Sequence, residues 1–136
     1  MRETMAKLDK ALIALNKGTL ARTIKWQPVN LKETPGLAGY DTLEGKIFQS
    51  GYKGKNLCIY KYGTRYYVDE DEWHPTTCYR LLFVDNDFKE EWVFPDNRAI
   101  KDLYDSVTFQ IANADRFFDD CINELSEDDL KDGNPF

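Results

Sequence analysis

The sequence contains few of the residues that carry metal or redox chemistry. Its 136 residues include one histidine, His74, and three cysteines whose wide spacings form neither a CxxC pair nor an even disulfide set. No apolar run approaches the roughly 20 residues of a membrane span, because the densest runs are residues 11–15 and 81–84. We expect no secretion signal, since Asp9 and Lys10 interrupt the only early apolar stretch. The sequence therefore predicts a cytoplasmic protein that uses no metal ion, no cofactor and no membrane.

The composition is typical of a folded domain rather than of a disordered chain. Hydrophobic residues make up 42% of the sequence and charged residues 31%. Because a domain usually spans about 100 to 150 residues, we predict a single α+β domain over residues 1–136. We expect residues 126–136 to form a mobile acidic tail, since chain ends are seldom ordered unless something ties them down.

Charge is distributed unevenly along the chain. Residues 1–65 carry twelve Lys or Arg and five Asp or Glu, a balance of +7, whereas residues 66–136 carry six and nineteen, a balance of −13. The two balances add to the net charge of −6. This asymmetry fits a basic face for nucleic acid, an acidic face for a basic partner, or two halves that attract one another within the fold. The sequence leaves these three alternatives open.

Apolar spacing predicts a helix near each end of the chain. Apolar residues recur at three- and four-residue steps over residues 3–17, and Gly18 is expected to end that helix. Asp96 provides an N-terminal cap for a second helix, whose apolar seam extends over residues 100–125. We expect one long helix buried along its length, or two nearly collinear helices broken near residues 113–115.

Several strands are predicted between these helices. Residues 46–52 and 56–62 flank a short basic turn that contains the glycine a hairpin needs, and residues 78–85 and 88–94 form a second hairpin. The segment 28–45 is punctuated by proline and glycine, so we expect a long loop there. That loop is either a contact surface or a plain connection that covers one end of the core.

These elements predict an α+β fold. We expect an antiparallel sheet of about four or five strands, with the N-terminal helix and the long C-terminal helix, or two collinear helices, on one face. Thirteen of the nineteen aromatic residues lie between Tyr40 and Phe94. Because side chains alternate between the faces of a strand, one helix-covered face and one open, tyrosine-rich face would account for them. The open face is a candidate contact surface.

One catalytic hypothesis rests on His74, which closely follows the acidic residues 69–72. A carboxylate hydrogen-bonded to the imidazole would make it a general base or a pH switch. No serine or cysteine nucleophile stands in a recognisable setting, so we assign no catalytic residue and do not favour an enzyme. The acidic run also lacks the ligand order of a calcium loop, and we interpret it as a hairpin loop kept soluble by its carboxylates.

The hairpin at residues 46–67 offers a second hypothesis, the binding of single-stranded nucleic acid. Lys53, Lys55, Lys61 and Arg65 are interleaved with tyrosines, and single strands require a cationic groove with stacking rings. Against this, tyrosine is favoured in any sheet, and a dedicated nucleic-acid binder is usually basic, whereas this chain has a net charge of −6. Nucleic acid is therefore the less favoured partner.

Protein binding is the function that the sequence favours. Aromatic side chains of the sheet would supply contact area, because binding energy concentrates in Trp, Tyr and Arg, and the acidic C-terminal helix would orient the partner. The apolar seam of that helix would also permit a homodimer. The candidate contact residues are Tyr60, Tyr62, Tyr66, Trp73, Asp119, Asp120 and Glu124.

A leading helix, hairpins and a closing helix follow one another in this chain, marked by the segments Ile24-Lys25-Trp26, Leu57-Cys58-Ile59-Tyr60-Lys61, Leu103-Tyr104 and residues 118–125. This layout resembles that of small uncharacterised accessory proteins of bacteria and of their mobile elements or phages. The resemblance spans most of the chain and brings no known activity and no catalytic residue. It implies an accessory protein that acts by binding.

Overall fold

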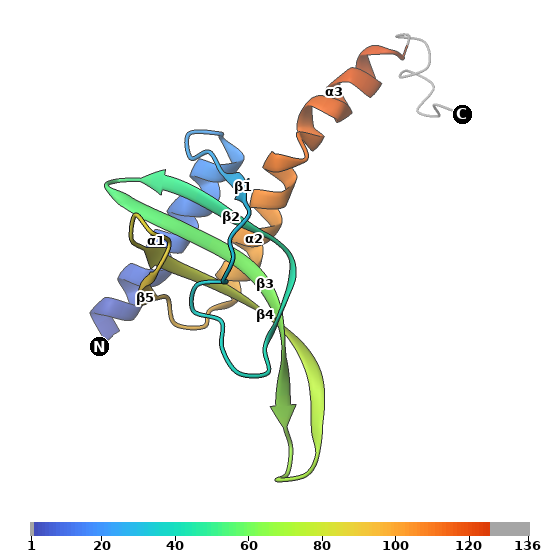
Figure 1. The fold of residues 1–136 in the computed structure, drawn as a ribbon. Helices are drawn as coiled ribbons and strands as arrows, with labels where there is room; N and C mark the ends of the chain where they lie inside the picture. The colour runs from blue at the N-terminus through green and yellow to red at the C-terminus, as the bar shows by residue number, and fades with distance from the viewer. Residues whose placement is uncertain (1, 126–136) are drawn as a thin grey trace.

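A computed structural model describes residues 2–125, in which five strands lie between one N-terminal and two C-terminal helices (Figure 1). The α+β prediction is confirmed. The predicted acidic tail, residues 126–136, lies outside the described residues. The elements are α1 (Arg2–Leu20), β1 (Gln27–Val29), β2 (Thr42–Tyr52), β3 (Lys55–Tyr67), β4 (Trp73–Val84), β5 (Glu90–Val93), α2 (Arg98–Ile111) and α3 (Ala114–Asn123).

The five strands form one antiparallel sheet in chain order, β1-β2-β3-β4-β5. β3 and β4 are longer than predicted and project from the sheet as a two-stranded arm, residues 64–76 (Figure 1). Gly63 lies within β3, where a Cβ would stand 2.8 Å from Oε1 of the flexible Glu44 side chain, so a larger residue would displace that carboxylate. Pro75 is tolerated within β4 because β5 pairs only with residues 82–84, which leaves that edge of the arm open.

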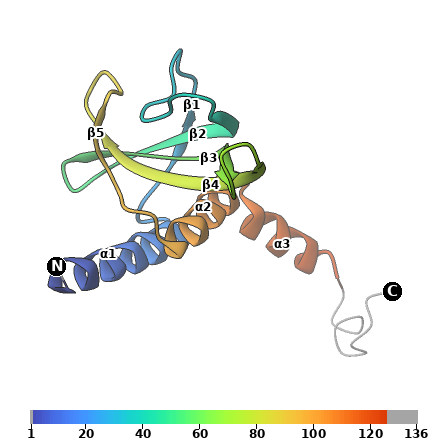
Figure 2. The same ribbon diagram turned by 90° about the horizontal axis from the view of Figure 1, so that it is seen from below.

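One face of the sheet packs against α1 and α2, which lie on the same side in Figure 2. The contacts between these helices and the sheet are almost entirely apolar, and burial of apolar surface is the main driving force for folding. The Met5 side chain is exposed, although its spacing places it with the buried positions of α1. The buried residues of this layer include Leu12, Leu15, Phe48, Leu57, Ile59, Leu81, Ile100, Leu103 and Val107.

The end of α1 differs from the prediction. The helix continues past Gly18 to Leu20, and Arg22 takes the left-handed conformation with φ 63°. Gly18 is needed for packing instead, because a Cβ at that position would lie 2.6 Å from Ile24 Cδ1. The amides of Thr23 and Ile24 both donate to the Gly18 carbonyl at 3.0 Å, which closes the chain over the helix end.

The C-terminal helical segment is divided in two. α2 is capped by Asn97 rather than by Asp96, with Asn97 Oδ1 accepting from the Ala99 amide at 2.9 Å. It ends at Ile111, and Asn113 adopts a left-handed φ of 55° before α3 begins. The two-helix alternative is therefore confirmed. The expectation of burial along the whole seam is wrong, because no residue of α3 is buried.

Gln110 fixes the end of α2 to the segment between α1 and β1. Its Nε2 donates to the carbonyls of Thr19 and Ile24, each at 2.8 Å, and its Oε1 accepts from the Trp26 amide at 2.8 Å. A buried polar group is stabilising only when its hydrogen bonds are satisfied, and here one side chain satisfies three backbone groups. α3 therefore leaves the domain from a well-anchored base.

The second face of the sheet is covered by the loop that follows β1. Figure 2 shows this loop on the side of the sheet opposite to α1 and α2. Leu31 and Leu37 pack against a second apolar cluster that contains Tyr60, Tyr62 and Leu82. The prediction of an open, tyrosine-rich face is therefore wrong over the centre of the sheet, and the interpretation of the loop as a covering connection is the one that fits.

Hydrogen bonds hold this loop in place. Tyr60 donates from its hydroxyl to the Pro35 carbonyl at 2.6 Å. Arg80 donates to the Gly36 carbonyl, to the Tyr60 hydroxyl at 3.3 Å and to the Tyr62 hydroxyl at 3.0 Å. The positive φ of Gly36, 75°, lets the loop turn directly above Leu82 and Tyr60.

The replacement Tyr60→Phe tests the covering loop. It removes the only hydroxyl that the Pro35 carbonyl accepts from among the described residues, so we expect the free energy of unfolding to fall by about 1–3 kcal/mol. Urea unfolding followed by fluorescence measures it. Tyr66→Phe is the matched control, since Tyr66 is exposed; equal losses in the two variants would contradict the docked loop.

Candidate functional site

The structure separates the predicted contact residues into buried and exposed groups. Tyr60 is 0% exposed and Tyr62 is 6% exposed, so neither ring can contact a partner. Burial raises the pKa of Tyr60 and raises the pKa of Tyr62 to about 12. The prediction that Tyr60 and Tyr62 contact a partner is wrong because the loop after β1 lies over these rings. Tyr66 and Trp73 lie on the exposed arm instead, at 63% and 44% exposure.

Four side chains form one exposed surface on the arm, which we call the arm face: Tyr40, Arg65, Tyr67 and Trp73. The Arg65 Cζ lies 4.6 Å from the centre of the Tyr40 ring and 4.5 Å from that of Trp73. Its Nη1 donates to the Tyr67 hydroxyl at 3.3 Å. The rings of Tyr40 and Tyr67 meet edge to face with centres 6.1 Å apart. The guanidinium is therefore held in place by aromatic rings that remain open to solvent.

Strand register explains which side chains share the arm face. Arg65 pairs with Pro75 and Tyr67 pairs with Trp73, and directly paired residues of an antiparallel ladder project to the same face. Tyr66 pairs with His74 one step away, so these two side chains project to the opposite face. The predicted residues Tyr66 and Trp73 therefore do not belong to one surface.

Tyr40 reaches the arm from the loop before β2. Its neighbour Asp41 accepts a hydrogen bond from the Thr64 hydroxyl, which ties the end of the loop to the base of the arm. A hollow of about 370 Å³ lies beside these residues, lined among others by Thr42, Glu44 and Trp73. The arm face is thus a shallow, partly aromatic surface rather than a flat strand.

The acidic residues 69–72 form the turn at the tip of the arm, as expected for a hairpin loop. The Val68 amide donates to the Glu72 carbonyl at 3.0 Å and closes this turn. Over residues 64–76 one arginine stands against four carboxylates, a balance of −3. The surroundings of the arm face are therefore negative.

His74 does not have the surroundings that a general base requires. Its side chain is exposed, and within residues 2–125 it makes no hydrogen bond or ion pair. No carboxylate of the acidic turn orients the imidazole. The arrangement that motivated the catalytic hypothesis is therefore missing from the described part of the chain.

Asp119 and Asp120 lie on α3, and Glu124 is the C-terminal cap of this helix, which stands at the end of the molecule opposite to the arm (Figure 1). The same helix exposes Phe117, Phe118 and Ile122. Phe118 has an aromatic neighbour in Phe109 of α2, with ring centres 6.2 Å apart. The predicted acidic residues therefore stand beside an exposed apolar surface, although the apolar seam of the sequence predicted that this segment is buried.

The cationic side chains of the nucleic-acid hypothesis do not form one patch. Lys53 and Lys55 stand at the turn between β2 and β3, whereas Arg65 lies on the arm. Ten residues of strand separate Lys55 from Arg65, about 33 Å at 3.3 Å per residue. Lys61 lies between them, and Tyr60 and Tyr62 beside it are buried. The stacking rings and the cationic groups are therefore not combined on one surface.

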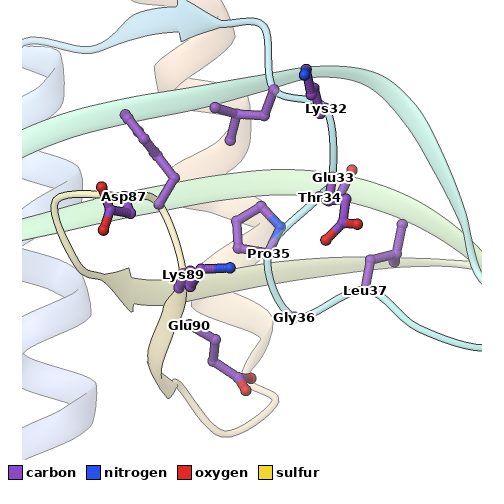
Figure 3. Close-up of a pocket in the computed structure, with 11 residues that line it drawn as sticks. Lys32, Glu33, Thr34, Pro35, Gly36, Leu37, Asp87, Lys89 and Glu90 are labelled. Carbon is purple, nitrogen blue, oxygen red and sulfur yellow. The ribbon is translucent and has the colours of Figure 1, made fainter.

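A cleft of about 610 Å³ separates loop residues 31–37 from the turn at residues 87–90 (Figure 3). This volume falls within the roughly 300–1,000 Å³ of ligand pockets. Two lysines and three acidic side chains line it together with apolar ones, and the lining residues, all within 2–125, include no histidine, cysteine or serine. The described residues also contain no group of three His, Cys, Asp or Glu side chains placed to hold a metal ion. We assign no catalytic residue or metal site on this basis.

Comparison of the chain with family models, curated proteins and solved structures finds no match. Among residues 2–125, no helix combines the length and apolarity needed to cross a bilayer. The exposed surfaces of the described residues are therefore the features of this protein that bear on its function.

Sequence reasoning missed several residues of these surfaces. Tyr67 shares a strand face with Arg65 by the two-residue alternation alone, so that pairing was detectable. Tyr40 belongs to the loop predicted over residues 28–45, and only the folded loop brings it to Arg65. The exposure of Phe117 and Phe118 was not detectable, because an apolar seam does not say what covers it.

Thiol labelling tests the exposure of α3. Cys121 on α3 is exposed, whereas Cys58 is buried in β3 and burial raises its pKa to about 11. Because the thiolate is the reactive form, we expect Cys121 to be alkylated rapidly at pH 8 and Cys58 only after unfolding. Mass spectrometry identifies the modified residue, and Cys121→Ala should abolish the rapid phase. Alkylation of native Cys58 at the rate of Cys121 would contradict the structure.

Proposed function

We propose that this protein acts by binding another protein through the arm face. The observation that supports the proposal is the exposure of Tyr40, Tyr67 and Trp73 around Arg65, on an arm that extends beyond α1 and α2 (Figure 1). A soluble protein seldom exposes a group of large apolar side chains unless the group mediates an interaction. The combination of Trp, Tyr and Arg is also the one in which binding energy concentrates.

The stacking of Arg65 favours tight binding. A flexible arginine loses rotamer freedom when a partner immobilises it, at a cost of roughly 0.5–1.5 kcal/mol. Arg65 is already held between the rings of Tyr40 and Trp73, so most of that ordering is complete before association. The same stacking leaves guanidinium N–H groups free to bind an acceptor on the partner.

The acidic turn indicates the chemistry of the partner. With a balance of −3 around the arm face, a partner that carries basic side chains beside an apolar depression would be attracted and oriented. The same charge opposes a nucleic-acid backbone, since phosphate binding requires an excess of cations. Protein is therefore the partner class that the arm favours, in keeping with the accessory role that the layout resemblance implies.

The replacement Trp73→Ala tests the proposal, and Tyr66→Ala on the opposite face of the same arm is its matched control. Each immobilised chain is exposed to host extract, and the retained proteins are quantified by mass spectrometry. We expect a protein retained by the wild-type and Tyr66→Ala chains but not by Trp73→Ala. With that partner purified, calorimetry should show binding weakened about thirtyfold, the loss of ~2 kcal/mol that a hot-spot aromatic contributes. Identical sets of retained proteins for the three chains would contradict the proposal.

An oligonucleotide titration tests the alternative function, the binding of single-stranded nucleic acid. We expect no binding of single-stranded DNA or RNA at low salt, measured by fluorescence anisotropy, because the cations are dispersed and the arm is negative. Binding with a steep salt dependence that flattens in a Lys53→Gln, Lys55→Gln variant would instead establish the nucleic-acid function.

A further inference from the structure

α3 has an apolar stripe bordered by acid on both sides. Phe117, Phe118 and Ile122 are 64%, 51% and 52% exposed. At 100° per residue, these three positions share one side of the helix with Ala114 and Cys121. Asp115 and Asp119 then border one flank of this stripe, and Asp120 and Glu124 border the other. An amphipathic helix of this kind is usually buried against an apolar surface.

Among residues 2–125, α3 covers no apolar surface beyond the end of α2. Its first residues follow Asn113, whose side chain accepts a hydrogen bond from Arg22, and the helix then extends away from the sheet (Figures 1 and 2). None of its residues is buried. Within the described part of the chain the stripe therefore stays exposed.

A matching apolar groove lies between α1 and the turn that joins β2 to β3. The small side chains of Ala11 and Ala14 form the side of the groove that belongs to α1. The rings of Tyr52, Phe83 and Phe94 line it from the sheet. The groove has a volume of about 260 Å³, below the roughly 300 Å³ at which ligand pockets begin. Apart from Lys53 and Lys55, every residue that lines it is apolar or aromatic, so the groove suits the apolar side chains of another helix.

The rim of this groove is basic. Lys53 and Lys55 line it, and the Lys55 ammonium lies 5.3 Å above the centre of the Phe83 ring. Lys7 stands one turn before Ala11 on α1, and side chains four residues apart share a helix flank. The lining residues, all within the described chain, include no acidic side chain.

We infer that this groove binds α3 of a second copy of the chain. Phe117, Phe118 and Ile122 would enter the apolar groove, and the carboxylates that border them would meet Lys53 and Lys55. In both views α3 and the β2–β3 turn project from opposite sides of the molecule (Figures 1 and 2), so the contact is between copies. Direct pairing of two α3 helices is disfavoured, because it would bring the bordering carboxylates of both copies together.

The size of α3 sets the strength of this association. Ten helical residues are about 15 Å long at 1.5 Å per residue, so one contact lies below the roughly 1,200–2,000 Å² of a stable interface. We expect weak, concentration-dependent self-association. If each of two copies inserts its α3 into the groove of the other, the two equal contacts close a dimer. If each copy instead binds the α3 of a different neighbour, the copies form an open chain. The inference goes beyond the proposed function, since the arm face takes no part in it.

Charge reversal tests the contact. A groove variant carries Lys53→Glu with Lys55→Glu, and a helix variant carries Asp119→Lys with Asp120→Lys. Sedimentation velocity over a dilution series should show self-association of the wild-type chain and at least about tenfold weaker association of each variant alone. An equimolar mixture of the two variants should associate again, because each reversed surface finds its complement. This recovery cannot arise from misfolded variants.

Matched controls keep the inference separate from the proposed function. Lys32→Glu with Lys89→Glu changes the net charge by the same amount on the loop side of the sheet, and should leave self-association unchanged. Trp73→Ala should also self-associate like the wild type, whatever it does to partner retention. A wild-type chain that stays monomeric throughout, a groove variant that associates normally, or a mixture that does not recover would each overturn the inference and leave the arm-face proposal to its own test.

Discussion

The hydrogen bonds of Arg80 are the constraint on which the exposed surface of this protein depends. From β4 the guanidinium reaches the Gly36 carbonyl of the loop and the hydroxyls of Tyr60 and Tyr62, and it lies over the Tyr62 ring with Cζ 4.5 Å from the ring centre. This side chain joins the loop after β1 to the strands beneath it. Because the loop stays there, the central tyrosines are core residues, and the exposed aromatic surfaces of the arm and of α3 lie where the chain extends beyond this cover.

Both exposed aromatic surfaces arise in this way. β3 and β4 continue past the layer formed by α1 and α2, so the arm lies outside that apolar layer as described by residues 2–125, and its rings pack instead around Arg65. α3 continues past the anchor that Gln110 provides at the end of α2. A compact domain of this size can bury only part of its apolar residues. Met5, Ile13, Leu20 and Trp92 are exposed elsewhere, whereas the arm and α3 each gather several exposed large apolar side chains, which is the distribution expected of interaction sites.

Local sequence patterns predicted the helices and strands well, but they did not predict which residues pack around each element. The periodicity of α1, the turn at Lys53-Gly54-Lys55 and the α+β class follow from short-range rules. Gly18 was misjudged because its usual helix-ending effect was outweighed by packing against Ile24, and Pro75 stands inside a strand because that strand edge is unpaired. A covering role for the loop was one of the two alternatives that the sequence offered, but its position over Tyr60 and Tyr62 was not predictable, since the contact of Pro35 with Tyr60 joins residues 25 positions apart. For the candidate site, Trp73 was identified correctly as exposed, whereas its neighbour Tyr40 required the fold.

The most direct test of this account is the relaxation of side-chain proton resonances by a soluble paramagnetic agent, which acts on groups in proportion to their exposure. If the loop covers the sheet and the arm and α3 are open, the agent should broaden the resonances of Trp73 and Phe117 strongly and leave those of Tyr60, Tyr62 and Leu82 nearly unchanged. Broadening of the Tyr60 and Tyr62 rings to the extent seen for Trp73 would show that the central face is open in solution, and would contradict the account.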